Sequence, residues 1–158
     1  MEGNDLRKAK YAVTKKFTIP VGHRLSKHEG LCKNYHGHNF DIVVGISSSE
    51  LNDNNMVIDF KDLKSIVNEI LDEWDHTLLV NKNDPIFKND EFKNTFRMIA
   101  FDFDPTAEKM AEVLYTSLSS RFQELKLWKE WKAYHTPLIV DFVQVYENDG
   151  SSAIFSIE

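Results

Sequence analysis

KYAVTKKFTI, residues 10–19, alternates apolar and polar side chains as a half-buried β-strand does. NFDIVVGISS, residues 39–48, repeats this alternation. The apolar positions of the two segments are Tyr11, Val13, Phe17, Ile19, Phe40, Ile42, Val44 and Ile46. Because a long polar stretch separates them, we predict two antiparallel strands that are joined by a long loop.

Downstream of these strands the apolar residues follow the three-and-four spacing of amphipathic helices. The segment VIDFKDLKSIVNEILDEWDH, residues 57–76, predicts a helix with Asp59 as N-cap that ends near Asp75 and His76. The segment DPTAEKMAEVLYTSLSSRFQEL, residues 104–125, predicts a second helix with Asp104 as N-cap and Pro105 in its first turn.

Two final strands are predicted in LIVDFVQVYE, residues 138–147, and AIFSIE, residues 153–158. The order of two strands, two helices and two strands predicts an α+β fold in a single domain, 1–158, with residues 1–9 as a flexible tail. Residues 80–104 are interpreted as a polar loop, and residues 126–137 as a helix extension or an insertion. The uncovered face and edges of so small a sheet predict self-association.

The bulk composition is that of a water-soluble globular protein: 158 residues, 42% hydrophobic and 28% charged. No apolar run is long enough for a membrane span, and the polar N-terminus lacks the features of a secretory signal. A single cysteine favours a cytoplasmic location. The net charge of −6 argues against a nucleic-acid partner. Residues 1–38 nevertheless carry eight Lys or Arg against three Asp or Glu, which indicates either a solvated surface or a positive field for a small anion.

Three histidines with the spacing of metal ligands lie in VGHRLSKHEGLCKNYHGHNF, residues 21–40. His36 and His38 are two residues apart, so in a strand both side chains point to one face. His23 lies just beyond the preceding strand and can supply a third nitrogen. Three neutral imidazoles with an open fourth position are the ligand set of a catalytic zinc, and we predict a metal site here.

The only cysteine, Cys32, lies four residues before His36 and has three possible roles. It can be a fourth ligand that closes a structural metal site, a buried structural thiol, or a nucleophile or base beside an open metal. Four ligands from one short segment would leave no position for a substrate. The neighbouring Lys33 and a bound cation favour a reactive thiolate. The residues alone leave all three roles open.

Two further groups suggest proton transfer and ligand binding. Asp75 can hold the tautomer of His76, as the orienting carboxylate of a general base does, or His76 can simply be a cation at the end of a helix. Glu147 closes the third strand. Its carboxylate is either solvent-exposed or a buried group that pairs with two N–H groups of a guanidine-like heterocycle.

The motifs GHRL, CKNYHGHNF, MVIDFKDLK, DHTLL, PTAE and VYEN occur in this order from about residue 11 to the C-terminus. Together they resemble the family of 6-pyruvoyltetrahydropterin and 6-carboxytetrahydropterin synthases. The resemblance implies the tunnelling fold, a four-stranded antiparallel sheet with two helices on one face. It also implies that three sheets close into a barrel and that two trimers stack into a homohexamer.

The resemblance assigns a role to each candidate residue. It implies that the ligands of Zn²⁺ are His23, His36 and His38, and that the catalytic residues are Cys32, Asp75 and His76. It implies that the residues of the pterin pocket are Glu147, which anchors the pterin, and Thr106 and Glu108, which line or support the pocket.

The spacing around the cysteine separates branches of that family. Three residues lie between Cys32 and His36, as in the bacterial 6-carboxytetrahydropterin synthases of queuosine biosynthesis, whereas the animal biopterin enzymes have a longer gap. A third branch, which leads toward folate, has glutamate in place of this cysteine. The resemblance thus implies a zinc-dependent lyase that converts 7,8-dihydroneopterin triphosphate to 6-carboxytetrahydropterin. The alternatives are 6-pyruvoyltetrahydropterin synthase activity and a non-catalytic zinc- or pterin-binding protein.

Overall fold

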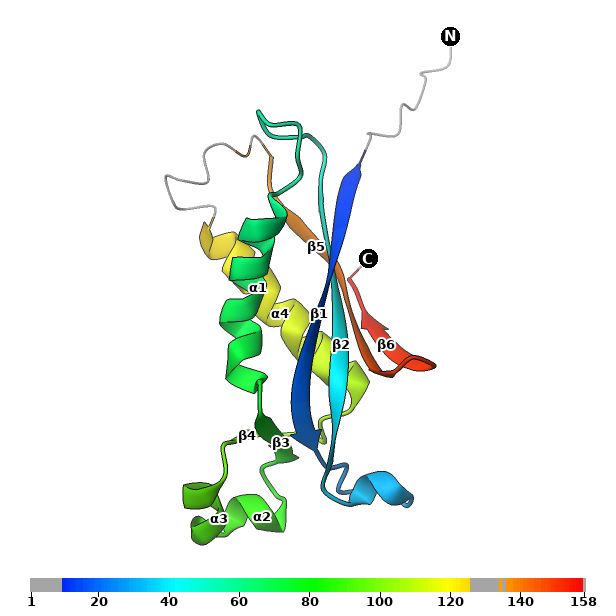
Figure 1. Cartoon of the computed structure of the whole chain (residues 1–158), viewed down its shortest axis with the longest axis vertical. Coiled ribbons are helices and arrows are strands. Elements are labelled where there is room, and N and C mark those ends of the chain that lie inside the picture. Colours follow the sequence, from blue (N-terminus) through cyan, green and yellow to red (C-terminus); the bar gives the residue numbers. More distant parts are fainter. Residues whose placement is uncertain (1–9, 126–133, 135, 158) are drawn as a thin grey trace.

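The computed structural model of the protein describes residues 10–125, 134 and 136–157. Figure 1 shows the arrangement of its helices and strands. In chain order they are β1 (Tyr11–His23), the short 3-10 helix η1 (Leu31–Lys33), β2 (His36–Ser48), α1 (Phe60–Trp74), β3 (Thr77–Asn81), α2 (Pro85–Lys88), α3 (Asp90–Thr95), β4 (Met98–Phe101), α4 (Ala107–Leu125), β5 (Ile139–Asn148) and β6 (Ser151–Phe155).

One sheet runs through the protein in the strand order β4-β3-β1-β2-β5-β6. β1 and β2 pair antiparallel along their whole length, from Tyr11 opposite Ser48 to His23 opposite His36. β5 and β6 continue the antiparallel pairing beyond β2. The predicted strand pair, the two C-terminal strands and the α+β class are therefore confirmed.

The prediction of a plain loop over residues 80–104 is wrong. That segment contains the end of β3, the short helices α2 and α3, and β4. β3 pairs parallel to β1, and β4 pairs parallel to β3, so the sheet extends beyond the four predicted antiparallel strands. Strands of five and four residues carry too little alternation to be recognised from the sequence.

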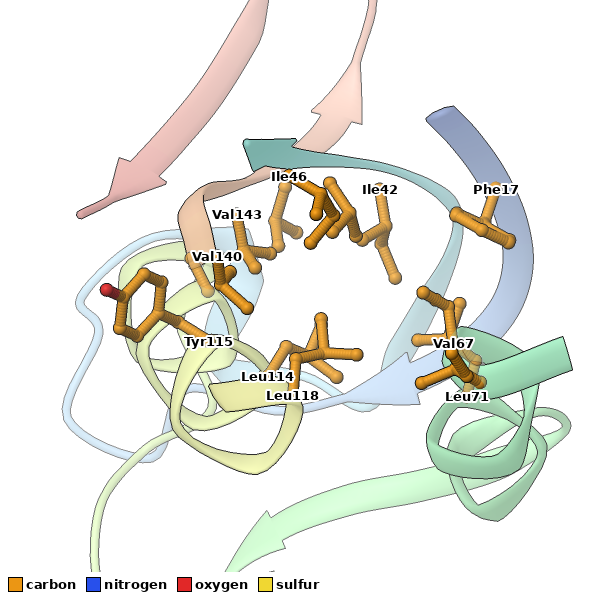
Figure 2. Close-up of a cluster of buried hydrophobic side chains, with 14 of the residues drawn as sticks. Phe17, Ile42, Ile46, Val67, Leu71, Leu114, Tyr115, Leu118, Val140 and Val143 are labelled. Carbon is orange, nitrogen blue, oxygen red and sulfur yellow. The ribbon is translucent and has the colours of Figure 1, made fainter. Parts of the chain in front are cut away.

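α1 and α4 lie on the same face of the sheet, as predicted (Figure 1). Their apolar sides meet the apolar side of β1, β2 and β5 in one hydrophobic core (Figure 2). The core residues with no measurable exposure include Phe40, Ile42, Val44, Ile46, Leu63, Leu79, Ala111, Val143 and Val145. Alternation in β1 and β2 places residues 19, 21 and 23, and residues 36, 38 and 40, on this helix-covered side.

The two long helices differ in how well their N-caps were predicted. Asp59 caps α1 as predicted, because its carboxylate accepts a hydrogen bond from the Lys61 N–H at 2.7 Å. α4 begins at Ala107, and the hydroxyl of Thr106 accepts from the Lys109 N–H at 3.3 Å. The prediction of Asp104 as the cap is therefore wrong. Its carboxylate instead accepts from the Ser26 hydroxyl and the Lys27 N–H.

The predictions for residues 1–9 and for most of 126–137 lie outside the described residues. Within the described part of the chain, no helix combines the length and apolar character that crossing a membrane requires.

The role of Thr106 as a cap can be tested by stability. We expect Thr106→Ala to lower the free energy of unfolding by about 1 kcal/mol, because the Lys109 N–H loses its partner. Urea unfolding of Thr106→Ser is the matched control, since serine keeps the hydroxyl. Equal stability of the Ala and Ser variants would contradict this assignment.

Candidate functional site

Three imidazoles converge where β1 ends and β2 begins. His23, the last residue of β1, lies directly opposite His36, the first residue of β2. His38 lies two residues further along β2 and therefore points to the same side of the sheet. One ring nitrogen from each histidine lies within 4.8 Å of the other two. This spacing suits three ligands of a single metal ion.

Hydrogen bonds orient two of these rings. Nδ1 of His23 donates to the carbonyl oxygen of Pro105 at 2.9 Å, and Nδ1 of His36 donates to that of Asn34 at 2.8 Å. Because a carbonyl oxygen only accepts, each of these rings carries its proton on Nδ1 and its lone pair on Nε2. Histidines that bind metals are commonly held by such a second hydrogen bond.

The three Nε2 atoms are buried, and none of them forms a hydrogen bond with a described residue. Three buried polar atoms without partners are costly unless another group satisfies them. Burial, with a smaller contribution from His36 and opposed by the Pro105 hydrogen bond, lowers the pKa of His23. The ring is therefore neutral at pH 7, as a metal ligand must be. This donor set fits a divalent metal that keeps one open position.

Gly37 allows β1 and β2 to approach closely between the two histidines of β2. A Cβ at this position would lie 3.0 Å from the carbonyl oxygen of Val21. Such a contact is tighter than side chains normally tolerate, so a larger residue would push the strands apart. The glycine thus helps to keep His36 opposite His23.

A pocket of about 310 Å³ brings together four of the predicted site residues from three parts of the chain. Cys32 comes from η1, Thr106 and Glu108 from the start of α4, and Glu147 from the end of β5. His28, which the sequence analysis did not single out, also lines this pocket. Residues far apart in the sequence meet here because α4 begins beside the loop between β1 and β2.

Glu147 reaches this pocket from a β-bulge. Tyr146 pairs with Ser152 and Asn148 pairs with Ser151, so Glu147 is the extra residue, without a pairing partner in β6. A β-bulge changes the direction of a side chain, which then no longer follows the regular alternation of side chains between the two faces of the sheet. The carboxylate of Glu147 also acts on the metal-binding cluster, because its negative charge counteracts the lowering of the His23 pKa.

His76, the partner of Asp75, lines a different pocket from Cys32. The Asp75 carboxylate accepts a hydrogen bond from Nδ1 of His76 at 2.8 Å. His76 is highly exposed and has a left-handed backbone with φ of 54°. It lines a groove of about 400 Å³ on β1 and β2, together with residues such as Pro20 and Asn39. Among the described residues, His76 and Cys32 therefore line different pockets.

Arg97 holds the turn that carries this pair. Its guanidinium donates to the carbonyl oxygens of Asp72, Glu73 and Asp75 at the end of α1. These carbonyl groups carry the negative end of the helix dipole, which favours a cation. Arg97 was not predicted as a functional residue, because it lies in the segment interpreted as a loop.

The family relationship follows from comparison with known proteins. Residues 12–158 match the family profile described as 6-pyruvoyl tetrahydropterin synthase. The chain belongs to this family. The match covers every strand and helix named above except the first residue of β1.

Relatives in this family carry a narrower name. The chain is 28% identical over 142 residues to 6-carboxy-5,6,7,8-tetrahydropterin synthase of Aquifex aeolicus, an overlap of 78% of this chain and 88% of the relative. It is 32% identical over 130 residues to the protein of the same name from Haemophilus influenzae, covering 75% and 92% of the two chains.

The fold is that of a solved family member. The structure of Caenorhabditis elegans 6-pyruvoyl tetrahydropterin synthase superposes with a TM-score of 0.65 at 19% identity, over 97% of this chain and 99% of that one. The tunnelling fold expected from the sequence motifs is therefore confirmed for the single chain.

Removal of one imidazole should impair metal binding at the three-histidine cluster. We expect His38→Ala to bind zinc, used as the probe metal, at least about tenfold more weakly than the unmodified protein in a chelator competition assay. His28→Ala is the control, because His28 lies outside the cluster. Equal zinc affinity of the two variants would contradict the metal site.

Proposed function

We propose that this protein is a zinc-dependent lyase that converts 7,8-dihydroneopterin triphosphate and one water molecule to 6-carboxy-5,6,7,8-tetrahydropterin, with loss of triphosphate and acetaldehyde. The observation that carries the proposal is that Cys32 and Glu147 line one pocket, and that a cluster of three histidines with unpaired ring nitrogens is hydrogen-bonded to Pro105, the residue before Thr106 of the pocket lining. The names of the relatives from Aquifex aeolicus and Haemophilus influenzae support the choice of product. As inferred for bacterial relatives with this cysteine spacing, the product would enter queuosine biosynthesis in the cytoplasm.

His23, His36 and His38 would hold the zinc ion. When bound there, zinc supplies Lewis-acid polarisation of the hydroxyl groups on the substrate side chain. Two of the rings are already fixed in the tautomer that leaves Nε2 free for the metal. The pterin side chain would therefore enter the pocket with its hydroxyl groups toward the histidines.

Cys32 would act as the base of the reaction. Its thiolate is suited to remove a proton from the carbon next to the pterin ring or from the side chain. The side chain is half-buried and lines the pocket that also contains Glu147. This geometry favours the base over the fourth-ligand role, because the metal cluster is formed by the three histidines without the cysteine.

Glu147 would bind the pterin ring. One carboxylate can accept two N–H hydrogen bonds from the aminopyrimidinone edge, which fixes the orientation of the ring. Thr106 and Glu108 would support the ring from the start of α4. Lys27 and Lys33, on the exposed loop around Cys32, would attract the triphosphate.

The Asp75–His76 pair would serve the reaction from a second subunit. Within one chain His76 lines a groove that it shares with His38, whereas Cys32 lines a different pocket. A homohexamer in which sheets join side by side can bring this groove to the pocket of a neighbour. His76, oriented by Asp75, would then exchange a proton on the side of the substrate opposite Cys32.

Turnover separates this proposal from its alternatives. Incubation with dihydroneopterin triphosphate should give a product with the mass of 6-carboxytetrahydropterin. Detection of 6-pyruvoyltetrahydropterin instead would establish the related synthase activity. Absence of triphosphate release by zinc-loaded protein would favour a non-catalytic zinc- or pterin-binding role.

The role of Cys32 can be tested with a single variant. We expect Cys32→Ala to lower kcat by at least about a hundredfold while zinc content is unchanged, because a base is lost and a ligand is not. Metal analysis of the purified variant provides the control. Loss of zinc would show that Cys32 is a ligand, and retained turnover would show that it is a bystander.

The intersubunit role of His76 can be tested by complementation. Cys32→Ala and His76→Ala should each be inactive, whereas assemblies formed by co-expressing both should recover about a quarter of full turnover, because some sites receive both intact residues. The control is the co-expression of untagged and affinity-tagged Cys32→Ala subunits. Inactive mixed assemblies would contradict a site shared between subunits.

A further inference from the structure

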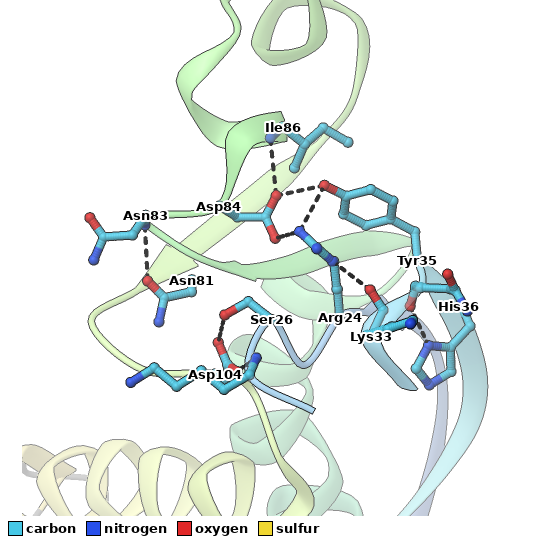
Figure 3. Close-up of polar contacts among 12 residues, drawn as sticks. Arg24, Ser26, Lys33, Tyr35, His36, Asn81, Asn83, Asp84, Ile86 and Asp104 are labelled. Carbon is cyan, nitrogen blue, oxygen red and sulfur yellow. Dashed lines mark hydrogen bonds and ion pairs between the residues drawn. The ribbon is translucent and has the colours of Figure 1, made fainter. Parts of the chain in front are cut away.

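Asp84 is a buried carboxylate in the segment that the sequence analysis interpreted as a loop. Its side chain is only 1% exposed and lies at the N-terminus of α2 (Figure 3). One oxygen accepts from the Tyr35 hydroxyl at 2.6 Å and from the Ile86 N–H at 3.0 Å. The other accepts from the Arg24 guanidinium at 2.6 Å. Asp84 therefore connects α2 to both ends of the loop between β1 and β2.

Arg24 carries this connection to the backbone around Cys32. Its Nε donates to the carbonyl oxygen of Lys33 at 2.6 Å, and its guanidinium lies 5.0 Å from the centre of the Tyr35 ring. The next residue, Leu25, donates its N–H to the carbonyl oxygen of Cys32 at 3.0 Å. Two consecutive residues thus fix the carbonyl groups of Cys32 and Lys33, and Figure 3 shows how Asp84 and Tyr35 enclose the Arg24 side chain.

The negative charge of Asp84 strengthens its contact with Arg24. Burial acts to raise its pKa, but the hydrogen bonds from Tyr35, from the Ile86 N–H and from Arg24 outweigh burial and leave the pKa below its usual value. The carboxylate is therefore ionised at neutral pH and forms a charge-assisted pair with Arg24. A neutral side chain at this position would leave the partly buried Arg24 without its counter-ion.

We propose that Asp84 is a positioning residue for Cys32, and that the turn from β3 into α2 serves to hold the cysteine loop against the pocket. Asp84 acts through Arg24 and is itself part of neither the metal-binding cluster nor the pocket lining. Its effect on turnover rests on the proposed function, whereas its effect on the placement of Cys32 does not.

The contacts of Asp84 distinguish positioning from general stabilisation. Its side-chain partners are Arg24, Tyr35 and the Ile86 N–H of its own helix. None of these residues belongs to the hydrophobic core between the sheet and the two long helices. Loss of the carboxylate should therefore loosen the loop while the core remains folded.

The single cysteine makes the loop measurable without any substrate. We would compare Asp84→Asn with Asp102→Asn, a matched control in the same segment whose exposed carboxylate pairs with Lys82. The first readout is the rate at which iodoacetamide alkylates Cys32, followed by mass at a fixed pH. The second is the split between kcat and KM for pterin turnover.

We expect Asp84→Asn to speed alkylation by roughly threefold or more, because the loop opens more often. We also expect it to lower kcat by about tenfold with KM changed by less than about twofold, because a displaced base acts on a substrate that still binds. The control should match the unmodified protein in both measurements.

A fall in thermal stability with unchanged alkylation and kcat would overturn the proposal, since Asp84 would then be merely structural. If Asp84→Asn fails to fold, Tyr35→Phe keeps the ring beside Arg24 and removes only the hydroxyl donor, and the same increase in alkylation is expected. If Asp84→Asn alters the alkylation rate but the unmodified protein has no pterin turnover, the proposed function is refuted and the positioning role of Asp84 stands.

Discussion

The register of β1 against β2 is the constraint on which the site depends. His23 lies opposite His36 only because the two strands pair without interruption from Tyr11 opposite Ser48. A slip of one residue would turn His36 and His38 to the other face of the sheet and would expose Phe40 and Ile42. The same alternation that buries the core therefore places the three imidazoles on one side.

The start of α4 joins the core to the site through three consecutive residues. Asp104 holds the loop through Ser26 and Lys27, the Pro105 carbonyl orients His23, and Thr106 caps the helix. The helix is anchored in the core by its apolar side. The N-terminus of α4 is therefore fixed in position, and it holds a metal ligand and the loop that carries Cys32 in place.

The segment between β3 and α4 likewise holds candidate site residues in place. Asp84 reaches the cysteine loop through Arg24, and Arg97 holds the turn before His76. Both residues act on backbone or charged groups that are distant in the sequence. Charged residues in a polar stretch are ordinarily solvated, so the sequence alone could not distinguish these two from their neighbours.

The sequence by itself determined the strand pair, both long helices, the Asp59 cap and the three-histidine cluster, because alternation, helical spacing and two-residue separation are local patterns. Only the tertiary structure decided which carboxylates cap helices or hold loops in place. Asp104 and Thr106 are both acceptable caps, and the choice depended on the loop that Asp104 contacts. The tertiary structure also placed His76 and Cys32 in different pockets, because the distance between two surface groups follows from the packing of the whole chain.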